Sequence, residues 1–252
     1  VENCYVRVAD VTIAPSTNEE PYVATFLKKS DVPYNDGNEI INWLLNFDLS
    51  GNTYRGTIKS NIVGLEPNTE YIALAFGYYG GVVTTELFRY DFKTDPEGEC
   101  ENSVVGVTVT APYSLVALET AMPDMFYGMF EMMGWYAMCA EIETAEPEGN
   151  VFMNIYNAED LVTTDLEYIK AEVCSYVSER SCLFVGENDK LYVMCAVTMD
   201  YRGNYSDMWI SEPFSYSYEN GFRDINEFLD KLGLKAETQS AKPSSIDLRL
   251  NK

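Results

Sequence analysis

Apolar and polar residues alternate along several short segments of this chain, a pattern typical of β-strands with one buried face. The clearest segments are residues 5–13, 22–27, 71–76 and 86–92. Residues 37–45 instead place Ile40, Trp43 and Leu44 at helical spacing, which predicts a short amphipathic helix. The polar, turn-prone tract at residues 95–99 ends this first series and predicts a domain boundary.

After this boundary the same order of elements returns. Residues 8–31 run parallel, without gaps, to residues 137–160, and both read as apolar strand, acidic turn and apolar strand. Residues 66–76 match residues 186–196, and each match is followed by a Gly/Tyr hairpin. A repeat of this kind predicts two related β domains in tandem.

The two copies differ at their starts. The second copy opens on an apolar strand at residues 103–110, whereas the first has only about seven residues in that place. We therefore expect the first domain either to lack its first strand or to have that edge completed by something else, because an exposed sheet edge invites association.

We predict an all-β chain with minor α content. The expected domains are a first sandwich at residues 1–95, a second at 99–218 with a Met- and aromatic-rich insertion at 119–134, and a C-terminal helix and tail at 219–252. Each sandwich is expected to carry a short crossover helix. Within the tail, residues 224–232 fit an amphipathic helix and residues 245–250 alternate like a strand.

The stretch Leu65–Phe76 carries a Leu-x-Pro-x-Thr-x-Tyr pattern that resembles the tyrosine corner of fibronectin type III modules, with Tyr71 at the corner position. In the second domain Leu191 stands at that position, so the resemblance gives this domain no corner tyrosine. Residues 200–206 with 212–214 look like hairpins in lipid-anchored surface proteins of Bacteroides-type gut bacteria. The resemblance covers about residues 1–218. It implies tandem immunoglobulin- or fibronectin-III-like β-sandwiches of the kind that serve as spacers, adhesion units and accessory binding domains.

Charge and composition remove several classes of function. The chain has 17 Lys and Arg against 40 Asp and Glu, a net charge of −23, and no histidine. Such a charge repels nucleic acids and anionic membrane surfaces, and the lack of histidine removes the commonest general base and metal ligand. No segment is apolar over the roughly 18 residues that a membrane span needs. We therefore predict no enzyme, no catalytic residue, no cofactor, no metal and no membrane insertion.

The six cysteines form no C-x-x-C pair, which favours buried thiols over a metal site. One pairing stays open, because Cys139 and Cys195 fall on the two strands that a disulfide bridges in antibody domains.

Four tyrosines at predicted hairpin tips are the candidate ligand contacts: Tyr78, Tyr79, Tyr201 and Tyr205. A tyrosine ring has a flat apolar face and a polar rim, which suits stacking on a sugar ring or packing on a protein. The structural alternative is that these rings simply cover the ends of the sandwiches.

These features predict a non-catalytic, extracytoplasmic binding or adhesion module of a bacterial cell-surface lipoprotein that captures protein or glycan. The lipid anchor is expected in a segment outside this sequence. Two alternatives stay open. The 40 carboxylates allow a carboxylate-dependent accessory glycoside hydrolase, and the repeat also fits a purely structural spacer.

Overall fold

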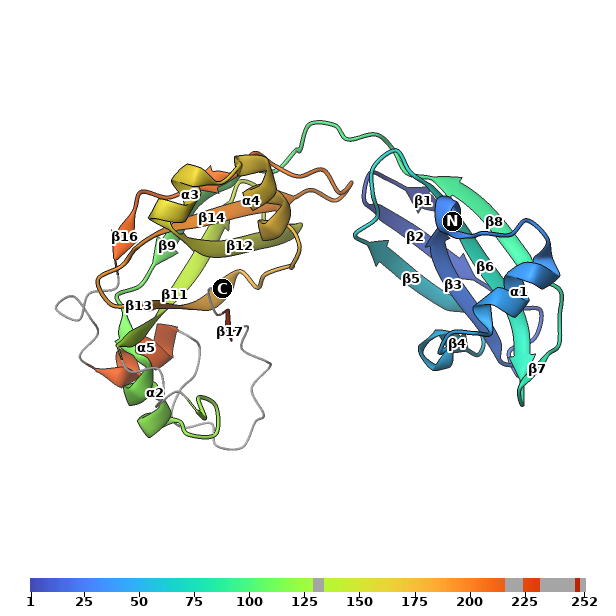
Figure 1. Ribbon diagram of the computed structural model, residues 1–252, viewed down its shortest axis with the longest axis horizontal. Coiled ribbons are helices and arrows are strands. Elements are labelled where there is room, and N and C mark those ends of the chain that lie inside the picture. Colours follow the sequence, from blue (N-terminus) through green and yellow to red (C-terminus); the bar gives the residue numbers. More distant parts are fainter. Residues whose placement is uncertain (129–133, 216–223, 232–247, 250–252) are drawn as a thin grey trace. The chain divides into compact units, whose positions relative to one another are not determined.

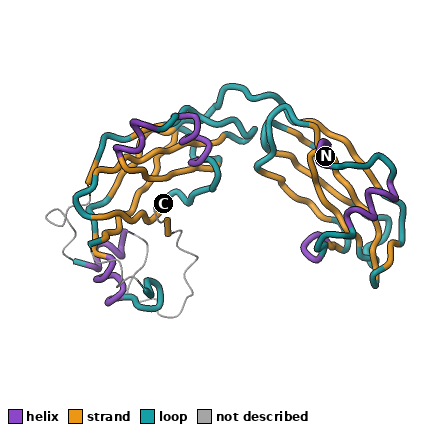
Figure 2. Tube along the Cα trace, viewed as in Figure 1, coloured by secondary structure: helices purple, strands orange, loops and turns teal. Residues whose placement is uncertain are grey.

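The computed structural model describes residues 1–128, 134–215, 224–231 and 248–249. These residues are mostly β-strand with a few short helices, which confirms the predicted fold class (Figures 1 and 2). The chain divides into two compact units. Unit 1 comprises Val1–Glu99 with Tyr201–Asn204, and unit 2 comprises Cys100–Asp200 with Tyr205–Lys252. Each unit is built on a sandwich of two β-sheets.

Unit 1 packs a three-stranded sheet against a five-stranded one. The first sheet has the order β1–β2–β5, formed by Asn3–Cys4, Val8–Ile13 and Ile58–Val63. The second has the order β4–β3–β6, with β7 and β8 on β6; these strands are Thr53–Tyr54, Tyr22–Lys28, Glu70–Tyr79, Val82–Val83 and Phe88–Lys93. The helical elements are η1 (Lys29–Asp31), α1 (Gly37–Leu44) and η2 (Ser50–Asn52). The first strand, which the sequence left in question, is therefore present but is only two residues long.

Unit 2 repeats this plan with a longer first strand and more α-helices. Its first sheet has the order β10–β11–β13–β17, with β9 also on β11; these strands are Tyr113–Ser114, Trp135–Thr144, Ser181–Glu187, Leu248–Arg249 and Val104–Val109. Its second sheet joins β12, β14, β15 and β16, which are Asn150–Asn157, Leu191–Met199, Trp209–Ile210 and Phe214–Ser215. The helices are α2 (Leu115–Ala121), α3 (Ala158–Thr163), α4 (Leu166–Val173) and α5 (Ile225–Lys231).

Several predicted segments in unit 2 differ in detail. Two helices, α3 and α4, occupy the crossover where one was expected. Of the strand predicted at residues 245–250, the two residues of β17 pair in parallel with β13. Part of the predicted insertion, residues 129–133, and most of the tail lie outside the described residues.

The strand register corrects one part of the predicted repeat. Tyr22 faces Gly77 in unit 1, and its equivalent in the gapless repeat, Val151, faces Thr198 in unit 2. Thr198 is therefore the equivalent of Gly77, and the second half of the repeat is displaced by one residue from the predicted match. The position of Tyr71 belongs to Tyr192, and the prediction for Leu191 was wrong.

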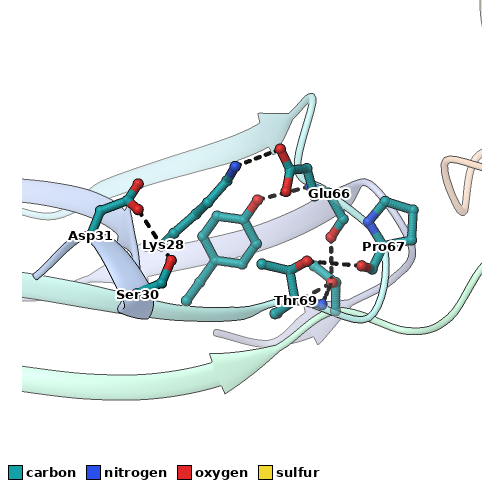
Figure 3. A network of polar contacts seen from close by, with 8 residues as sticks. Lys28, Ser30, Asp31, Glu66, Pro67 and Thr69 are labelled. Atoms are coloured by element: carbon teal, nitrogen blue, oxygen red, sulfur yellow. Dashed lines mark hydrogen bonds and ion pairs between the residues drawn. The ribbon is translucent and has the colours of Figure 1, made fainter. Parts of the chain in front are cut away.

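Both units consequently have a tyrosine corner. The Tyr71 hydroxyl accepts a hydrogen bond from the Glu66 amide N–H at 2.8 Å, within the polar network around Glu66 and Thr69 shown in Figure 3. The Tyr192 hydroxyl accepts one from the Glu187 amide at 2.9 Å. The turns match as well, because Asn68 and Asp189 each take a left-handed conformation, with φ of 52° and 63°, which short polar side chains tolerate.

The cysteines form no disulfide in this structure. Met138 and Ala140, which flank Cys139, belong to the buried interior of the unit 2 sandwich, as do Met194 and Ala196, which flank Cys195. Because successive side chains of a strand point to opposite faces, Cys139 and Cys195 point out of opposite sheets. The pairing that the sequence left open is therefore not formed.

Candidate ligand-binding depression on unit 1

An open depression of about 550 Å³ lies on unit 1. Its lining residues come from β4, from the end of β6 and from the loops next to these strands. Figure 1 shows where β4, β6 and β7 lie in the fold. The depression is lined by Pro21, Thr53, Tyr54, Arg55, Tyr78, Tyr79 and Gly80. Two of the predicted ligand contacts, Tyr78 and Tyr79, are therefore in its wall. Tyr54 and Arg55 are contributions that sequence reasoning missed.

The β6–β7 hairpin fixes the first wall. Gly80 and Gly81 have φ of 59° and 85°, so the two-residue turn places both in the left-handed region that glycine adopts without steric cost. This turn holds Tyr79 at the exposed end of the strand. The amide N–H of Tyr78 donates to the carbonyl of Pro21 at 3.2 Å. Pro21 also lines the depression, so this hydrogen bond connects the hairpin to another part of the wall.

A glycine is also required just before these tyrosines. A Cβ atom on Gly77 would lie 2.3 Å from the Thr84 hydroxyl oxygen, well inside contact distance. The Gly77 amide instead donates to the Thr85 hydroxyl at 2.7 Å. The side chains of Thr84 and Thr85, in the segment between β7 and β8, thus pack directly on the backbone of β6 just before Tyr78.

Strand β4 supplies the second wall. Tyr54 pairs with Tyr22 of β3, and their ring centroids are 6.1 Å apart. The Tyr22 hydroxyl donates to the Gly56 carbonyl at 2.9 Å, and burial raises the pKa of Tyr22, so the donor keeps its proton in alkaline solution. The Arg55 guanidinium donates to the Glu19 carbonyl, which anchors the one cation of the wall.

The chemistry that this wall offers is aromatic faces, hydroxyls and one guanidinium. None of the seven lining residues is an Asp or Glu, so the depression holds no acid/base pair of the kind that hydrolyses glycosides. Throughout the described part of the chain, no group of three His, Cys, Asp or Glu side chains is placed to hold a metal ion. Nor does any described helix have the length and apolarity that a bilayer crossing requires.

The other two predicted tyrosines are not part of this wall. Tyr205 is half-buried in unit 2, with its ring edge-to-face on Phe152 at 5.4 Å. Tyr201 is exposed and is described with unit 1; its ring lies 5.9 Å from that of Tyr5, and the Arg202 guanidinium is 5.9 Å from both rings. The four tyrosines therefore lie in three different surroundings.

Comparisons with known proteins add little to this picture. No protein-family model matches the chain, and no curated protein matches it. Among solved structures it is similar to the chicken CNTN1 FN1–FN3 domains, with 8% identity over 84% of this chain and 61% of that one, at a TM-score of 0.29. It is also similar to a segment of two fibronectin type III domains from chicken tenascin, with 7% identity over 85% of this chain and 95% of that one, at a TM-score of 0.22.

This chain thus spans less than two thirds of the CNTN1 structure. Both TM-scores are low, so the strand order described above, and not these likenesses, defines the fold.

Proposed function

We propose that this chain is a non-catalytic binding module and that unit 1 takes a neutral glycan in the tyrosine depression. The observation that supports this most is that Tyr54, Tyr78 and Tyr79 share one open depression. Tyrosine rings offer flat apolar faces to the C–H faces of sugar rings, and their hydroxyls offer hydrogen bonds at the rim.

The surroundings of these rings favour binding without rearrangement. Each tyrosine stands on a strand, and the Gly80–Gly81 turn and the Pro21 hydrogen bond restrain the hairpin. A wall that is already ordered loses less conformational entropy when a ligand arrives.

The charge balance favours an uncharged ligand. At a net charge of −23 the protein repels anions at long range, so sulfated or uronic-acid polymers are disfavoured. Arg55 supplies N–H donors, which a sugar hydroxyl or ring oxygen accepts without carrying charge.

We further propose the setting of this module: the surface or periplasm of a bacterium, in a lipoprotein whose anchor lies outside this sequence. The support is the resemblance of the Leu65–Phe76 corner motif and the 200–214 hairpins to secreted surface modules. In this setting the unit 1 depression serves capture or adhesion.

A glycan array followed by titration calorimetry tests the proposal. We expect the full chain to bind one or more neutral glycans, and Tyr79→Ala to weaken that binding about tenfold, the amount that one lost aromatic stacking contact of up to ~1.5 kcal/mol represents. Tyr34→Ala is the matched control, because Tyr34 is also an exposed tyrosine of unit 1 but does not line the depression.

Two results would contradict the proposal. The first is a wild-type chain that binds no glycan on the array. The second is equal weakening by both tyrosine variants, which would place the binding elsewhere. Hydrolysis of a bound glycan would favour the glycosidase alternative instead.

A further inference from the structure

Exposed apolar side chains are concentrated in one part of unit 2. Among the described residues, seventeen large apolar side chains are exposed, and five of them fall within residues 162–177. Single exposed apolar residues are normal on a protein surface, whereas several together mark a site of interaction. These five residues are called the α3–α4 surface below: Val162, Leu166, Tyr168, Tyr176 and Val177.

The α3–α4 surface is formed by two short helices and the segment that follows them. Val162 lies in α3, Leu166 and Tyr168 lie in the first turn of α4, and the other two residues come shortly after α4 ends. Figure 1 shows α3 and α4 over the sheet that contains β12 and β14, and both helices contact both strands. With eight residues α4 is about 12 Å long, so both of its ends lie within reach of one bound helix.

These exposed side chains are not the ones that hold α4 on its sheet. Ile169 and Val173, four positions apart, form the buried side of the helix. Tyr168 comes directly before Ile169, which places it about 100° further round the helix. It is 65% exposed, and Tyr176 is 71% exposed. The sheet is therefore covered without the α3–α4 surface.

The helix α1 of unit 1 shows what covering a sheet requires. It packs on β6 with a buried apolar side. Its exposed positions are all polar: Asn38, Glu39 and Asn42. A helix that only covers a sheet is typically polar on its outward side. The apolar outward residues of α3 and α4 thus go beyond that role.

The exposed charges around the α3–α4 surface are negative. Residues 158–180 contain two cations, Lys170 and Arg180, and both are half-buried. The Arg180 guanidinium is occupied, because it donates to the Thr144 hydroxyl at 2.9 Å and to the Pro147 carbonyl at 2.6 Å. Six carboxylates are exposed, and in the described part of the chain none of them has a lysine or arginine at ion-pair distance: Glu159, Asp160, Asp165, Glu167, Glu172 and Glu179.

We propose that the α3–α4 surface binds a basic amphipathic helix of another protein. The apolar stripe of that helix lies on Tyr168 and its apolar neighbours, and lysine or arginine side chains on either side of the stripe approach the six carboxylates. A helix carries both features on one face at regular spacing, which is how amphipathic helices are recognised by apolar surfaces. The opposite charges also speed the encounter and exclude partners of the wrong sign.

The same charges disfavour other occupants. A second copy of this chain also has a net charge of −23 and brings the same six carboxylates to the contact. Nucleic acids and anionic membranes are repelled in the same way. The α3–α4 surface also shares no residue with the proposed glycan depression, so a failed test of one proposal leaves the other standing.

The test uses the full chain and a synthetic peptide of about five helical turns that contains only leucine and lysine, with leucine at helical spacing. We expect the wild-type chain to bind this peptide in titration calorimetry. A scrambled peptide of the same composition has the same charge but no apolar stripe, and it should bind at least about tenfold more weakly.

Two double variants locate the binding. Tyr168→Ser/Tyr176→Ser should weaken binding at least about tenfold, because it removes two aromatic anchors. Tyr34→Ser/Tyr90→Ser is the matched control, since it makes the same chemical change at two exposed tyrosines of unit 1. It should leave binding within about twofold. Neither variant alters the net charge, so a difference between them comes from the apolar contact.

A second pair of variants tests the charges. Glu167→Gln/Glu172→Gln should weaken binding about threefold or more at low salt, and the difference should fade at high salt, because ions screen exposed charges. Glu20→Gln/Glu86→Gln removes the same charge from exposed positions of unit 1 and should have a smaller effect.

Four outcomes would overturn the proposal. The wild-type chain fails to distinguish the amphipathic peptide from the scrambled one. The two tyrosine variants weaken binding equally, or the two glutamine variants do, which would mean that net charge alone attracts the peptide. Sedimentation shows a dimer that Tyr168→Ser/Tyr176→Ser abolishes, which would assign the surface to a second copy. Alternatively, the chain binds phosphatidylcholine vesicles through the same two tyrosines, which would assign it to a lipid surface.

Discussion

Strands β5 and β13 hold the same place in the two sandwiches, yet their outward faces have opposite character. In unit 1, Asn61 of β5 faces Asp10, and its amide donates to the Asp10 carboxylate at 2.8 Å. In unit 2, the equivalent pair is Leu183 and Cys139. Leu183 is 1% exposed, whereas Asn61 is exposed.

A second apolar layer accounts for this difference. The outward side of β13 packs into a buried cluster formed with α2, α5 and the segment after α2: Leu115, Leu118, Phe126, Ala137, Leu183, Val185, Phe228 and Leu229. In the described part of unit 1, this face instead carries a polar network in which Asn3 and Asn61 both donate to Asp10. An antiparallel sheet can face water on one side. The outward pair is polar (Asp10 and Asn61) in unit 1, where this surface is exposed, and includes the buried Leu183 in unit 2, where helices cover it.

The opposite sheet shows no such divergence. In unit 1, Ile40, Ile41 and Leu44 of α1 cover Ile72, Leu74 and Phe76 of β6. The position of Leu74 belongs to Cys195 in unit 2, where α3 and α4 pack against β14. The contrast between a polar and an apolar outward surface is therefore found on one sheet of each unit, the sheet that contains β5 or β13.

The largest expected effect tests the second layer directly. Leu183→Ala should destabilise the chain by about 2–5 kcal/mol, because it removes a fully buried side chain and leaves a cavity. Asn61→Ala at the equivalent position should change stability by no more than about 0.5 kcal/mol, since the lost hydrogen bond is exposed. Urea unfolding of the two variants measures both. Equal losses would mean that the two faces are not energetically different.

Alkaline pH tests whether helices cover β14 as they cover β6. Burial raises the pKa of Cys195 to about 12, against an ordinary value of 9.0. The unfolded chain ionises this thiol first, so its contribution to stability is complete below pH 9 and is lost as the pH rises toward 12. The loss is about 1.4 kcal/mol per pH unit, or roughly 2 kcal/mol by pH 10.5.

Cys195→Val is the control for this effect. It keeps an apolar side chain of similar size, and the tyrosines that titrate in the same range are present in both chains. Chemical unfolding of the wild type and variant at a series of pH values should show a shallower decline for the variant. Parallel declines would show that Cys195 is accessible to water.

The tyrosine corners test what the two units share. Tyr192→Phe and Tyr71→Phe should each cost about 1–2 kcal/mol, because each leaves a backbone N–H without its acceptor. Leu191→Ala should be nearly neutral, since Leu191 is 56% exposed. Thermal unfolding of the three variants distinguishes the register seen here from the one predicted by sequence. A large loss of stability for Leu191→Ala, with none for Tyr192→Phe, would instead support the register that the sequence predicted.

The sequence predicted strands well and their register in unit 2 poorly, for a physical reason. Period-2 alternation located β3 and β6, but Tyr192–Met199 is buried on both faces, so alternation there carries no information about register. The unit 2 turn also lacks the Pro and Thr that mark Leu65–Phe76. The equivalence of Asn68 and Asp189 became visible only from their backbone conformations.

The candidate site shows the same limit. A Gly-Gly pair after Tyr78–Tyr79 predicts a hairpin tip from local sequence alone. Tyr54 lies near that tip because β4 pairs with β3 at Tyr22. In the sequence these two strands are separated by α1. A local sequence pattern does not indicate a pairing between distant strands. The part of the wall that β4 and Arg55 supply could therefore not be predicted from the sequence.

The smallest expected effect concerns the polar outer face of unit 1. Hydrogen bonds from Asn3 first and Asn61 second hold the pKa of Asp10 below its ordinary value of 3.8. Because the folded-state pKa is depressed, the stabilisation is present above the unfolded value and is lost as the pH falls through the folded one. An NMR titration of the side-chain carboxyl carbon should give a pKa below 3.8 in the wild type. Asn3→Ala should raise it more than Asn61→Ala. A wild-type pKa at or above 3.8 would show that water, not the two amides, solvates Asp10, and this face would then be merely exposed, without the network that distinguishes it from the covered face of unit 2.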